Sequence, residues 1–288
     1  MDKLVDFSSM SVEERRDWVS QSAGFTPEQQ NLLRQEGGLS LETADSMIDN
    51  VIGTYALPIG VIRGMVVNGK EYLVPMVCEE PWVVSCAEKG AKLAAQCSGF
   101  HATYTGSIMI SQIQITQVTS PHVACLKILE HKREILELAN QADPVLISLG
   151  GGAFDVEAKP LDTEVGGMVI TQLLVNTKDA MGANTVNTIA EKVAPLLAQI
   201  TGGKAYLRIL SNLAVHRLAR VHVSVSEEVL GGSAVVEGIL AAHAFAWNDP
   251  FRACTSNKGT MNGASPVACA TGNDIRAPGG RGPRLRSP

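Results

Sequence analysis

A glutamate and a lysine, far apart in the sequence, lie in surroundings that suit chemistry on a carbonyl group. Glu80 stands in CEEPWVV (78–84), where we expect it to cap a helix that follows an apolar run. Lys258 stands in RACTSNKGTMNGASPVACATGND (252–274), a predicted loop with few large side chains around the ammonium. An ammonium can stabilise the oxyanion of a reacting carbonyl, and a carboxyl group can transfer a proton. The alternatives are a glutamate that only caps the helix and an ordinary solvated lysine.

A second group of residues has the features of a nucleotide site. KDAMGANTVN (178–187) places Gly182 and Asn184 just ahead of a predicted helix, whose free N–H groups and positive dipole end suit a phosphate. The stretch matches neither the GxGxxG pattern nor a Walker loop. Asp143, between a predicted helix and the glycine turn of LISLGGGAFD (146–155), could accept a hydrogen bond from a ribose hydroxyl. The alternatives are a plain capping turn and an Asp-Pro turn.

The histidines and cysteines give no comparable signal. Six histidines are scattered along the chain without the spacing of a catalytic triad or a metal site. Six cysteines show no CxxC pattern, so we interpret them as reduced thiols that mostly fill the core. No metal site is predicted.

The elements that must position these residues begin with helices and a hairpin. Ser11 and Glu14 have capping-box spacing, and Thr26-Pro27 has the pattern of a helix start. VIRGMVVNGKEYLVPMV (61–77) predicts two strands joined at Asn68-Gly69. A helix should then run from Glu80-Pro81 toward Gln96.

The middle of the chain predicts a compact β-α-β-α-β unit inserted between two flanking parts. Its expected elements are a bulged strand (108–118), a helix (126–140), a strand (168–177), a helix (185–200) and a strand (205–210). A strand (220–225), a Gly-Gly turn and an alanine-rich helix (234–246) should follow. The fold class is therefore α/β (α+β).

Composition indicates a soluble, cytoplasmic protein with a sizeable core. The 288 residues are 45% hydrophobic and 18% charged, with a net charge of -5, which gives no reason to expect nucleic acid. No apolar run approaches the roughly 20 residues of a membrane span, and the N-terminus lacks an apolar signal segment. The last fourteen residues hold four arginines and no acid among prolines and glycines, and they cannot form a core.

Taken together and in order, seven blocks resemble the 3-hydroxy-3-methylglutaryl-coenzyme A reductase family, in its soluble class II form. They are DNVIGT, EEP, LGGG, DAMGANTVN, RILSNLA, NKGTMNG and ATGND, and the resemblance covers nearly all of residues 4–275. It implies a large mixed α/β domain for dimerisation and substrate binding, interrupted by a small non-Rossmann cofactor domain. The implied parts are residues 1–106 and 212–274 (large domain), 107–211 (small domain) and 275–288 (a tail unlike the family).

The resemblance implies two hydride reductions of hydroxymethylglutaryl-CoA to mevalonate and CoA with NAD(P)H, or the reverse. It assigns catalysis to Glu80, Lys258 and an Asp274 that couples them, and substrate binding to Arg252 and Asn262. Cofactor binding falls to six residues: Asp143, Asp179, Met181, Gly182, Asn184 and Asn187. Asp143 matches the position that selects NADH, because a carboxylate there repels the 2′-phosphate of NADPH; NADPH remains the alternative. DNVIGT matches a dimer interface, so we expect a homodimer or a higher oligomer.

The chain also departs from the family pattern. Trp82 replaces a small serine after EEP, and Ser8 stands where a basic residue for CoA phosphates is expected. Family members continue past ATGND to a catalytic histidine and a closing flap, so the resemblance implies a C-terminally truncated reductase. We expect negligible turnover from these 288 residues. The alternative function is an inactive remnant that only dimerises or binds the cofactor.

Overall fold

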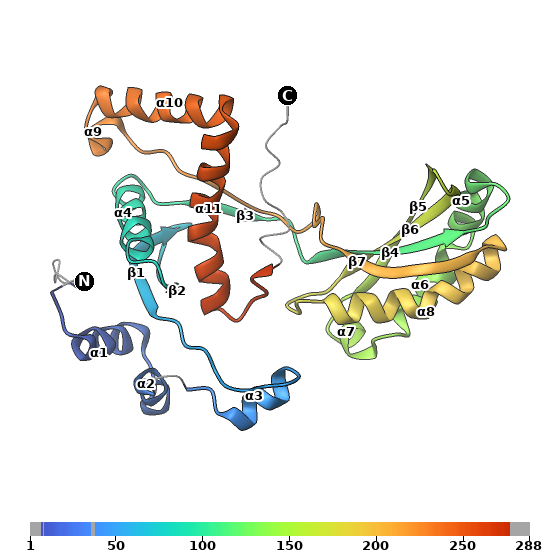
Figure 1. Cartoon of the computed structure of the whole chain (residues 1–288), viewed down its shortest axis with the longest axis horizontal. Helices are drawn as coiled ribbons and strands as arrows, with labels where there is room; N and C mark the ends of the chain where they lie inside the picture. The colour runs from blue at the N-terminus through green and yellow to red at the C-terminus, as the bar shows by residue number, and fades with distance from the viewer. Residues whose placement is uncertain (1–6, 8, 36–37, 277–288) are drawn as a thin grey trace.

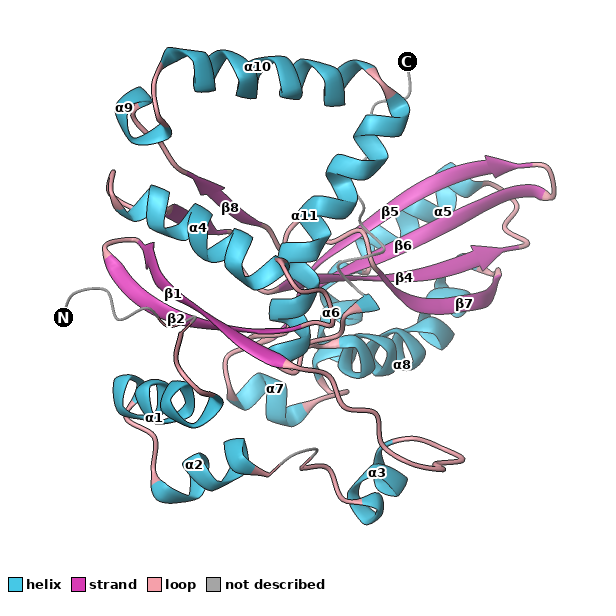
Figure 2. Ribbon diagram, turned by 60° about the vertical axis from the view of Figure 1, so that its left-hand side comes forward, coloured by secondary structure: helices cyan, strands magenta, loops and turns pink. Residues whose placement is uncertain are grey.

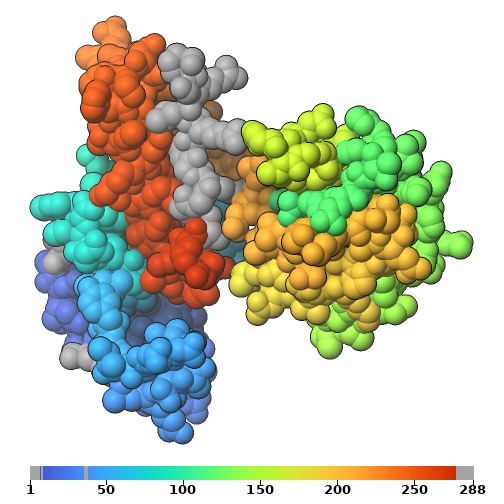
Figure 3. Space-filling model, turned by 45° about the vertical axis from the view of Figure 1, so that its right-hand side comes forward, coloured from blue at the N-terminus to red at the C-terminus, as the bar shows by residue number. Residues whose placement is uncertain are grey.

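The computed structural model describes residue 7, residues 9–35 and residues 38–276. Residues 108–211 form one body, called here the sheet body, and the segments before and after it form a second, the flanking body (Figure 1). In the space-filling view the sheet body is a mass distinct from the N-terminal and C-terminal segments (Figure 3).

The N-terminal segment folds into three short helices, α1 (Val12–Ala23), α2 (Pro27–Arg34) and α3 (Leu41–Met47). Both predicted helix starts are confirmed. Ser11 and Glu14 form a reciprocal capping box, and Thr26 forms a second one with Gln29. The amide N–H of Ser11 donates to Glu14 Oε2 at 2.7 Å.

The predicted hairpin is confirmed as β1 (Ile59–Val67) and β2 (Lys70–Val77). Asn68 and Gly69 have φ values of 51° and 78°, the left-handed backbone that a two-residue hairpin turn requires. Helix α4 (Val83–Ala95) packs against this hairpin, and Ile62, Met76 and Ala91 are buried between them. The hairpin and α4 thereby fix the position of the segment that carries Glu80.

The sheet body contains a four-stranded antiparallel sheet in the order β5-β6-β4-β7. The strands are β4 (Ile108–Thr116), β5 (Gly152–Thr163), β6 (Gly166–Asn176) and β7 (Lys204–Ser211). The helices α5 (Pro121–Glu130), α6 (Lys132–Asn140) and α8 (Ala183–Thr201) cover one face of the sheet (Figure 2). A single turn of helix, α7 (Pro144–Ser148), precedes β5. The succession β-α-β-β-α-β is that of a ferredoxin-like fold.

Two details of the predicted unit differ from the structure, and a third is confirmed. The strand β5 was not expected, because its second half is charged and its start lies in a glycine turn that predicts only a loop. The predicted helix over 126–140 is two helices, which meet at His131. The bulge expected in the first strand is present, between Ile113 and Ile115.

The core of the sheet body explains why α8 packs where it does. Val186, Ile189, Val193 and Leu197 recur at helical spacing and are fully or almost fully buried. They pack with β4 residues such as Ile113 and with β6 residues in one continuous hydrophobic cluster. This cluster fixes the N-terminus of α8, and therefore the end of the DAMGANTVN stretch, against the sheet.

The chain returns to the flanking body through β8 (Ala219–His222), which pairs with β3 (His101–Tyr104). Helices α9 (Glu227–Leu230), α10 (Ser233–Asn248) and α11 (Pro250–Ala270) follow. Helix α10 lies at the edge of the molecule with exposed apolar side chains, among them Ile239, Leu240 and Trp247 (Figure 1). No helix in the described ranges is both long enough and apolar enough to cross a membrane.

The loop predicted around Lys258 is wrong, because α11 continues to Ala270. Pro250 occupies the first turn, and the carboxylate of Asp249 caps the helix by accepting from the N–H of Arg252 at 2.7 Å. The small residues that suggested a loop allow this helix to pack against β2, α4 and α10.

Candidate functional site

Helix α11 brings Lys258 and Asn262 to Glu80. The ammonium of Lys258 lies 3.2 Å from Glu80 Oε2, and the amide nitrogen of Asn262 lies 3.5 Å from the same oxygen. Lys258 and Asn262 are four residues apart, so they share one face of the helix. The side chains of Lys258 and Glu80 are 66% and 45% exposed, which leaves both open to a small molecule.

The expectation that Glu80 caps α4 is wrong. Helix α4 begins at Val83, its N-cap position is Trp82, and no side chain caps it. Glu80 instead lies in the bend between β2 and α4. Because its carboxylate is not used by the helix, it can accept the hydrogen bonds from α11.

A cavity of about 330 Å³ lies beside this pair, between the start of α4 and α11. Glu80 and Asn262 line it together with Trp82, Cys86, Gly259 and three other residues. A Cβ on Gly259 or Gly263 would meet no atom within 4 Å, so the missing side chains leave open space rather than a packed contact. Trp82 is 72% exposed, so its indole lies at the rim of the cavity.

Asp274 and Arg252 lie apart from this hydrogen-bonded group. Asp274 follows the end of α11, and its carboxylate accepts from Arg276 Nε at 2.8 Å and Nη2 at 3.1 Å. These hydrogen bonds hold the pKa of Asp274 below its ordinary value. The structure therefore brings Glu80, Lys258 and Asn262 together without Asp274. Arg252 lies in the first turn of α11, about 9 Å along the axis from Lys258.

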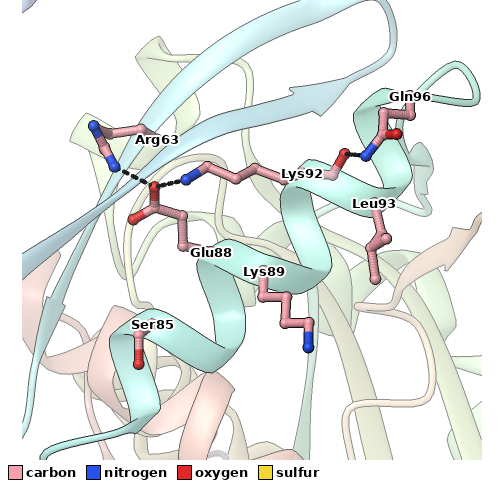
Figure 4. A pocket seen from close by; sticks show the side chains of 7 residues that line it. All are labelled: Arg63, Ser85, Glu88, Lys89, Lys92, Leu93 and Gln96. Carbon is pink, nitrogen blue, oxygen red and sulfur yellow. Dashed lines mark hydrogen bonds and ion pairs between the residues drawn. The ribbon is translucent and has the colours of Figure 1, made fainter. Parts of the chain in front are cut away.

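A larger cavity, of about 460 Å³, lies between β1 and α4 and was not predicted (Figure 4). Glu88 forms ion pairs with Arg63 and Lys92, each at 2.6 Å. Lys89 extends away from these three residues on the same helix (Figure 4). The lining residues include three cations and one carboxylate, which gives this cavity a positive charge balance. Ser8, where a basic residue for CoA is expected, lies outside the described residues.

Gly182 is the N-cap of α8 and has a φ of 91°. A Cβ at this position would lie 2.6 Å from Thr177 Cγ2 and 2.7 Å from Met109 Sδ. Glycine is therefore required both for the backbone conformation and for the close packing. Asp179, Met181 and Asn184 are exposed around it. With no side-chain cap, the N-terminus of α8 has the features of an anion site.

Asp143 lies next to the first turn of this helix, 42 residues before Thr185 in the sequence. One of its carboxylate oxygens caps α7 by accepting from Leu146 N–H at 2.9 Å, and the other accepts from Thr185 Oγ1 at 3.1 Å. The Asp-Pro turn is thus real, and it also places a carboxylate beside α8. Asn187 is bound elsewhere, because its Oδ1 accepts from the N–H of Leu210 on β7 at 2.9 Å.

Arg217 supports the same loop and was missed by the sequence analysis. Its guanidinium donates to the carbonyl oxygens of Met181 at 3.1 Å and Ala180 at 3.2 Å. Both carbonyls directly precede Gly182, so Arg217 orients the peptide groups at the start of α8. The sequence around Arg217 carries no motif that would have revealed this contact. Among the described residues, no group of three or more His, Cys, Asp or Glu could hold a metal ion.

Comparisons with known proteins point to one family. The family model for hydroxymethylglutaryl-coenzyme A reductase matches residues 11–279. A 3-hydroxy-3-methylglutaryl-coenzyme A reductase of Archaeoglobus fulgidus is 51% identical over 275 residues. That match includes 96% of this chain and 63% of the relative, so the chain spans less than two thirds of the length of that protein.

Solved structures of the reductase from Streptococcus pneumoniae have the same fold. One is 38% identical, with a TM-score of 0.90, over 94% of this chain and 74% of the other. Another, with the same identity and TM-score, is the class II enzyme bound to NADPH in open conformations. The ordered blocks of the sequence, the fold and the family match lead to one conclusion: the chain belongs to the hydroxymethylglutaryl-coenzyme A reductase family.

Proposed function

We propose that the protein reduces hydroxymethylglutaryl-CoA to mevalonate and CoA with NAD(P)H, or catalyses the reverse reaction. The observation that carries this proposal is the contact between Lys258 and Glu80 at the edge of a cavity. The fold and the 51% identity to a reductase support it.

The proposed chemistry divides between the two side chains. Lys258 stabilises the oxyanion that develops on the thioester carbonyl, and Asn262, on the same helix face, adds a neutral donor. Glu80 exchanges a proton with the product oxygen, and its contact with Lys258 keeps both groups beside the reacting carbon. Arg252, at the start of α11, would bind the carboxylate at the far end of the acyl chain. We retain Asp274 as the coupling residue, which requires that it exchange Arg276 for Lys258 when substrate binds.

The residues around α8 fit a nicotinamide dinucleotide, which supplies hydride when bound. Gly182 lets the backbone approach a phosphate closely, and Asp143 is positioned to bind a ribose hydroxyl. Asp179, Met181 and Asn184 surround the same helix start, while Asn187 contributes by fixing α8 to β7. We propose NADH as the preferred cofactor, because the carboxylate of Asp143 repels a 2′-phosphate.

We also propose the division into a small cofactor domain (107–211) and a large domain (1–106 and 212–274). The separate hydrophobic clusters of the sheet body and of the hairpin with α4 support it. The DNVIGT segment is proposed as part of a homodimer interface. Its support is the exposure of Ile52 and Tyr55, at 102% and 88%. Size-exclusion chromatography with light scattering tests this, with Ile52→Ser expected to shift the protein toward a monomer.

The reaction is tested by following NADH and NADPH oxidation with hydroxymethylglutaryl-CoA. Where turnover is measurable, Glu80→Gln and Lys258→Met should lower it by about 10²-fold or more, whereas the remote surface changes Glu28→Gln and Lys127→Met should not lower it. Because the chain spans 63% of its Archaeoglobus relative, the same variants should be tested in that full-length enzyme. Unchanged turnover there in either site variant would contradict the assignment. Dinucleotide binding without oxidation in this chain would favour the binding-module alternative.

A further inference from the structure

Lys178 directly precedes the candidate cofactor loop and has an unusual backbone conformation. Its φ is 53°, in the left-handed region that residues with a side chain seldom adopt. The N–H of Lys178 donates to Asn176 Oδ1 at 3.1 Å, which helps to hold this conformation. The chain therefore keeps a lysine at a position where glycine or asparagine would fit with less strain.

The lysine side chain lies beside the glycine turn. Its Nζ and Cε each lie 3.7 Å from the point where a Cβ on Gly150 would stand. Gly150 itself has a φ of 76° and lies shortly after α7, the helix that Asp143 caps. The ammonium thus lies close to Gly150, where no other atom among the described residues would come within 4 Å of a Cβ.

No ion pair to Lys178 is found in the described part of the chain. The residue is half-buried, so it is less hydrated than an ordinary surface lysine. The carboxylate of Asp143 accepts hydrogen bonds from Leu146 and Thr185 instead. An anionic ligand would complete the environment of this ammonium.

We propose that Lys178 binds a phosphate group of the dinucleotide, an inference that rests on the proposed function. The uncapped N-terminus of α8 begins four residues after Lys178, so the loop has a cation at one end and a positive helix end at the other. A dinucleotide carries a pyrophosphate, and NADPH carries a 2′-phosphate as well. Lys178 would thereby act with Asp143 in cofactor choice, as an attractive group beside a repulsive one.

The test is titration of the full chain with NADH and NADPH, followed by nicotinamide fluorescence. Lys178→Met removes the charge, Lys178→Arg retains it, and Lys178→Gly removes it while relieving the backbone strain. Lys127→Met, a surface lysine on α5, is the control. Lys178→Met and Lys178→Gly should weaken binding by about tenfold or more, and Lys178→Arg much less.

The two cofactors distinguish the two phosphate sources. Equal losses for NADH and NADPH identify the pyrophosphate, and a loss confined to NADPH identifies the 2′-phosphate. The proposal is overturned if Lys178→Gly binds both cofactors as tightly as the parent chain, since the lysine would then serve only the turn. It is also overturned if Lys127→Met causes the same loss. If the parent chain binds neither dinucleotide, the proposed function fails first.

Discussion

Lys258 and Glu80 are 178 residues apart in the sequence, yet Nζ of one lies 3.2 Å from Oε2 of the other. Both side chains are substantially exposed. Exposed ion pairs contribute only about 0–1 kcal/mol to stability, so this contact has little structural value. The contact matters for the position of the two groups, because it holds the ammonium of Lys258 beside a carboxyl group that lines a cavity.

Lys258→Met should therefore lower turnover with little effect on stability. We expect the free energy of unfolding to change by about 1 kcal/mol or less. Turnover in the full-length relative should fall by about 10²-fold or more, the scale for losing an oxyanion donor, with dinucleotide affinity unchanged. Urea denaturation and hydride-transfer rates measure the two quantities. A loss of turnover below about threefold would show that Lys258 does not stabilise the oxyanion.

Asp143→Ala and Asp143→Asn should both shift cofactor choice toward NADPH, because each removes the charge that repels a 2′-phosphate. Only the alanine variant should lose stability, by about 1 kcal/mol, because asparagine can still cap α7. Fluorescence titrations with NADH and NADPH measure the ratio of affinities. Equal losses for both cofactors would mean that Asp143 is a capping residue without a role in selection.

Gly182→Ala should destabilise the sheet body by about 1–3 kcal/mol, because the new Cβ meets Thr177 and Met109 in a strained backbone. Gly202→Ala is the matched control at the other end of α8. Gly202 also has a positive φ, 69°, but a Cβ there meets no atom within 4 Å. The control should therefore lose only the stability that alanine costs at a positive φ, and its dinucleotide affinity should not change. Equal effects of the two substitutions in urea denaturation and titration would argue against a specific role for Gly182.

Arg217→Ala should weaken dinucleotide binding by about tenfold, because two hydrogen bonds to the loop before Gly182 are lost. Arg217→Lys keeps the charge but can make only part of this contact. Its dinucleotide affinity should therefore lie between that of the parent chain and that of the alanine variant. Affinity for hydroxymethylglutaryl-CoA, measured by calorimetry, should not change. A parallel loss of both affinities would indicate general unfolding rather than positioning of the loop.

Trp82→Ser should enlarge the cavity beside Glu80 and tighten binding of hydroxymethylglutaryl-CoA by about three- to tenfold, since the indole crowds its rim. Trp247→Ser, which also removes an exposed tryptophan, is the control on α10. Calorimetric titration measures both. Weaker binding in the Trp82 variant would show that the indole contacts the ligand favourably.

Local sequence rules predicted those parts of the fold that local chemistry determines. The Asn68-Gly69 hairpin and the Ser11 capping box depend on a few neighbouring residues, and both were found as expected. Strand β5 was missed because its pairing with β6 is a tertiary contact, and its charged second half does not resemble a core strand. Helix α11 was missed because small residues favour neither helix nor loop strongly. Whether the helix forms is therefore decided by its N-cap and by its packing against other elements.

The candidate site was predictable as a set of residues but not as a geometry. The ordered blocks identified Glu80, Lys258 and Asn262, which meet in the structure. They could not show that Asp274 pairs with Arg276 or that Asn187 is bound to β7, because both contacts depend on the folded chain. Arg217 and Lys178 lie outside any strong motif, and only their contacts with backbone or turn reveal them.

Ile110 on β4 pairs with Ser211 on β7, so the chain enters and leaves the sheet body at nearly the same point. A segment whose two ends meet can be inserted into a host protein, or removed from it, by bridging a short distance. Neither hydrophobic cluster would need to be rebuilt. The proposed cofactor unit could thus be exchanged as a cassette, so that evolution or an engineer could replace the electron donor while Glu80 and Lys258 stay encoded on either side.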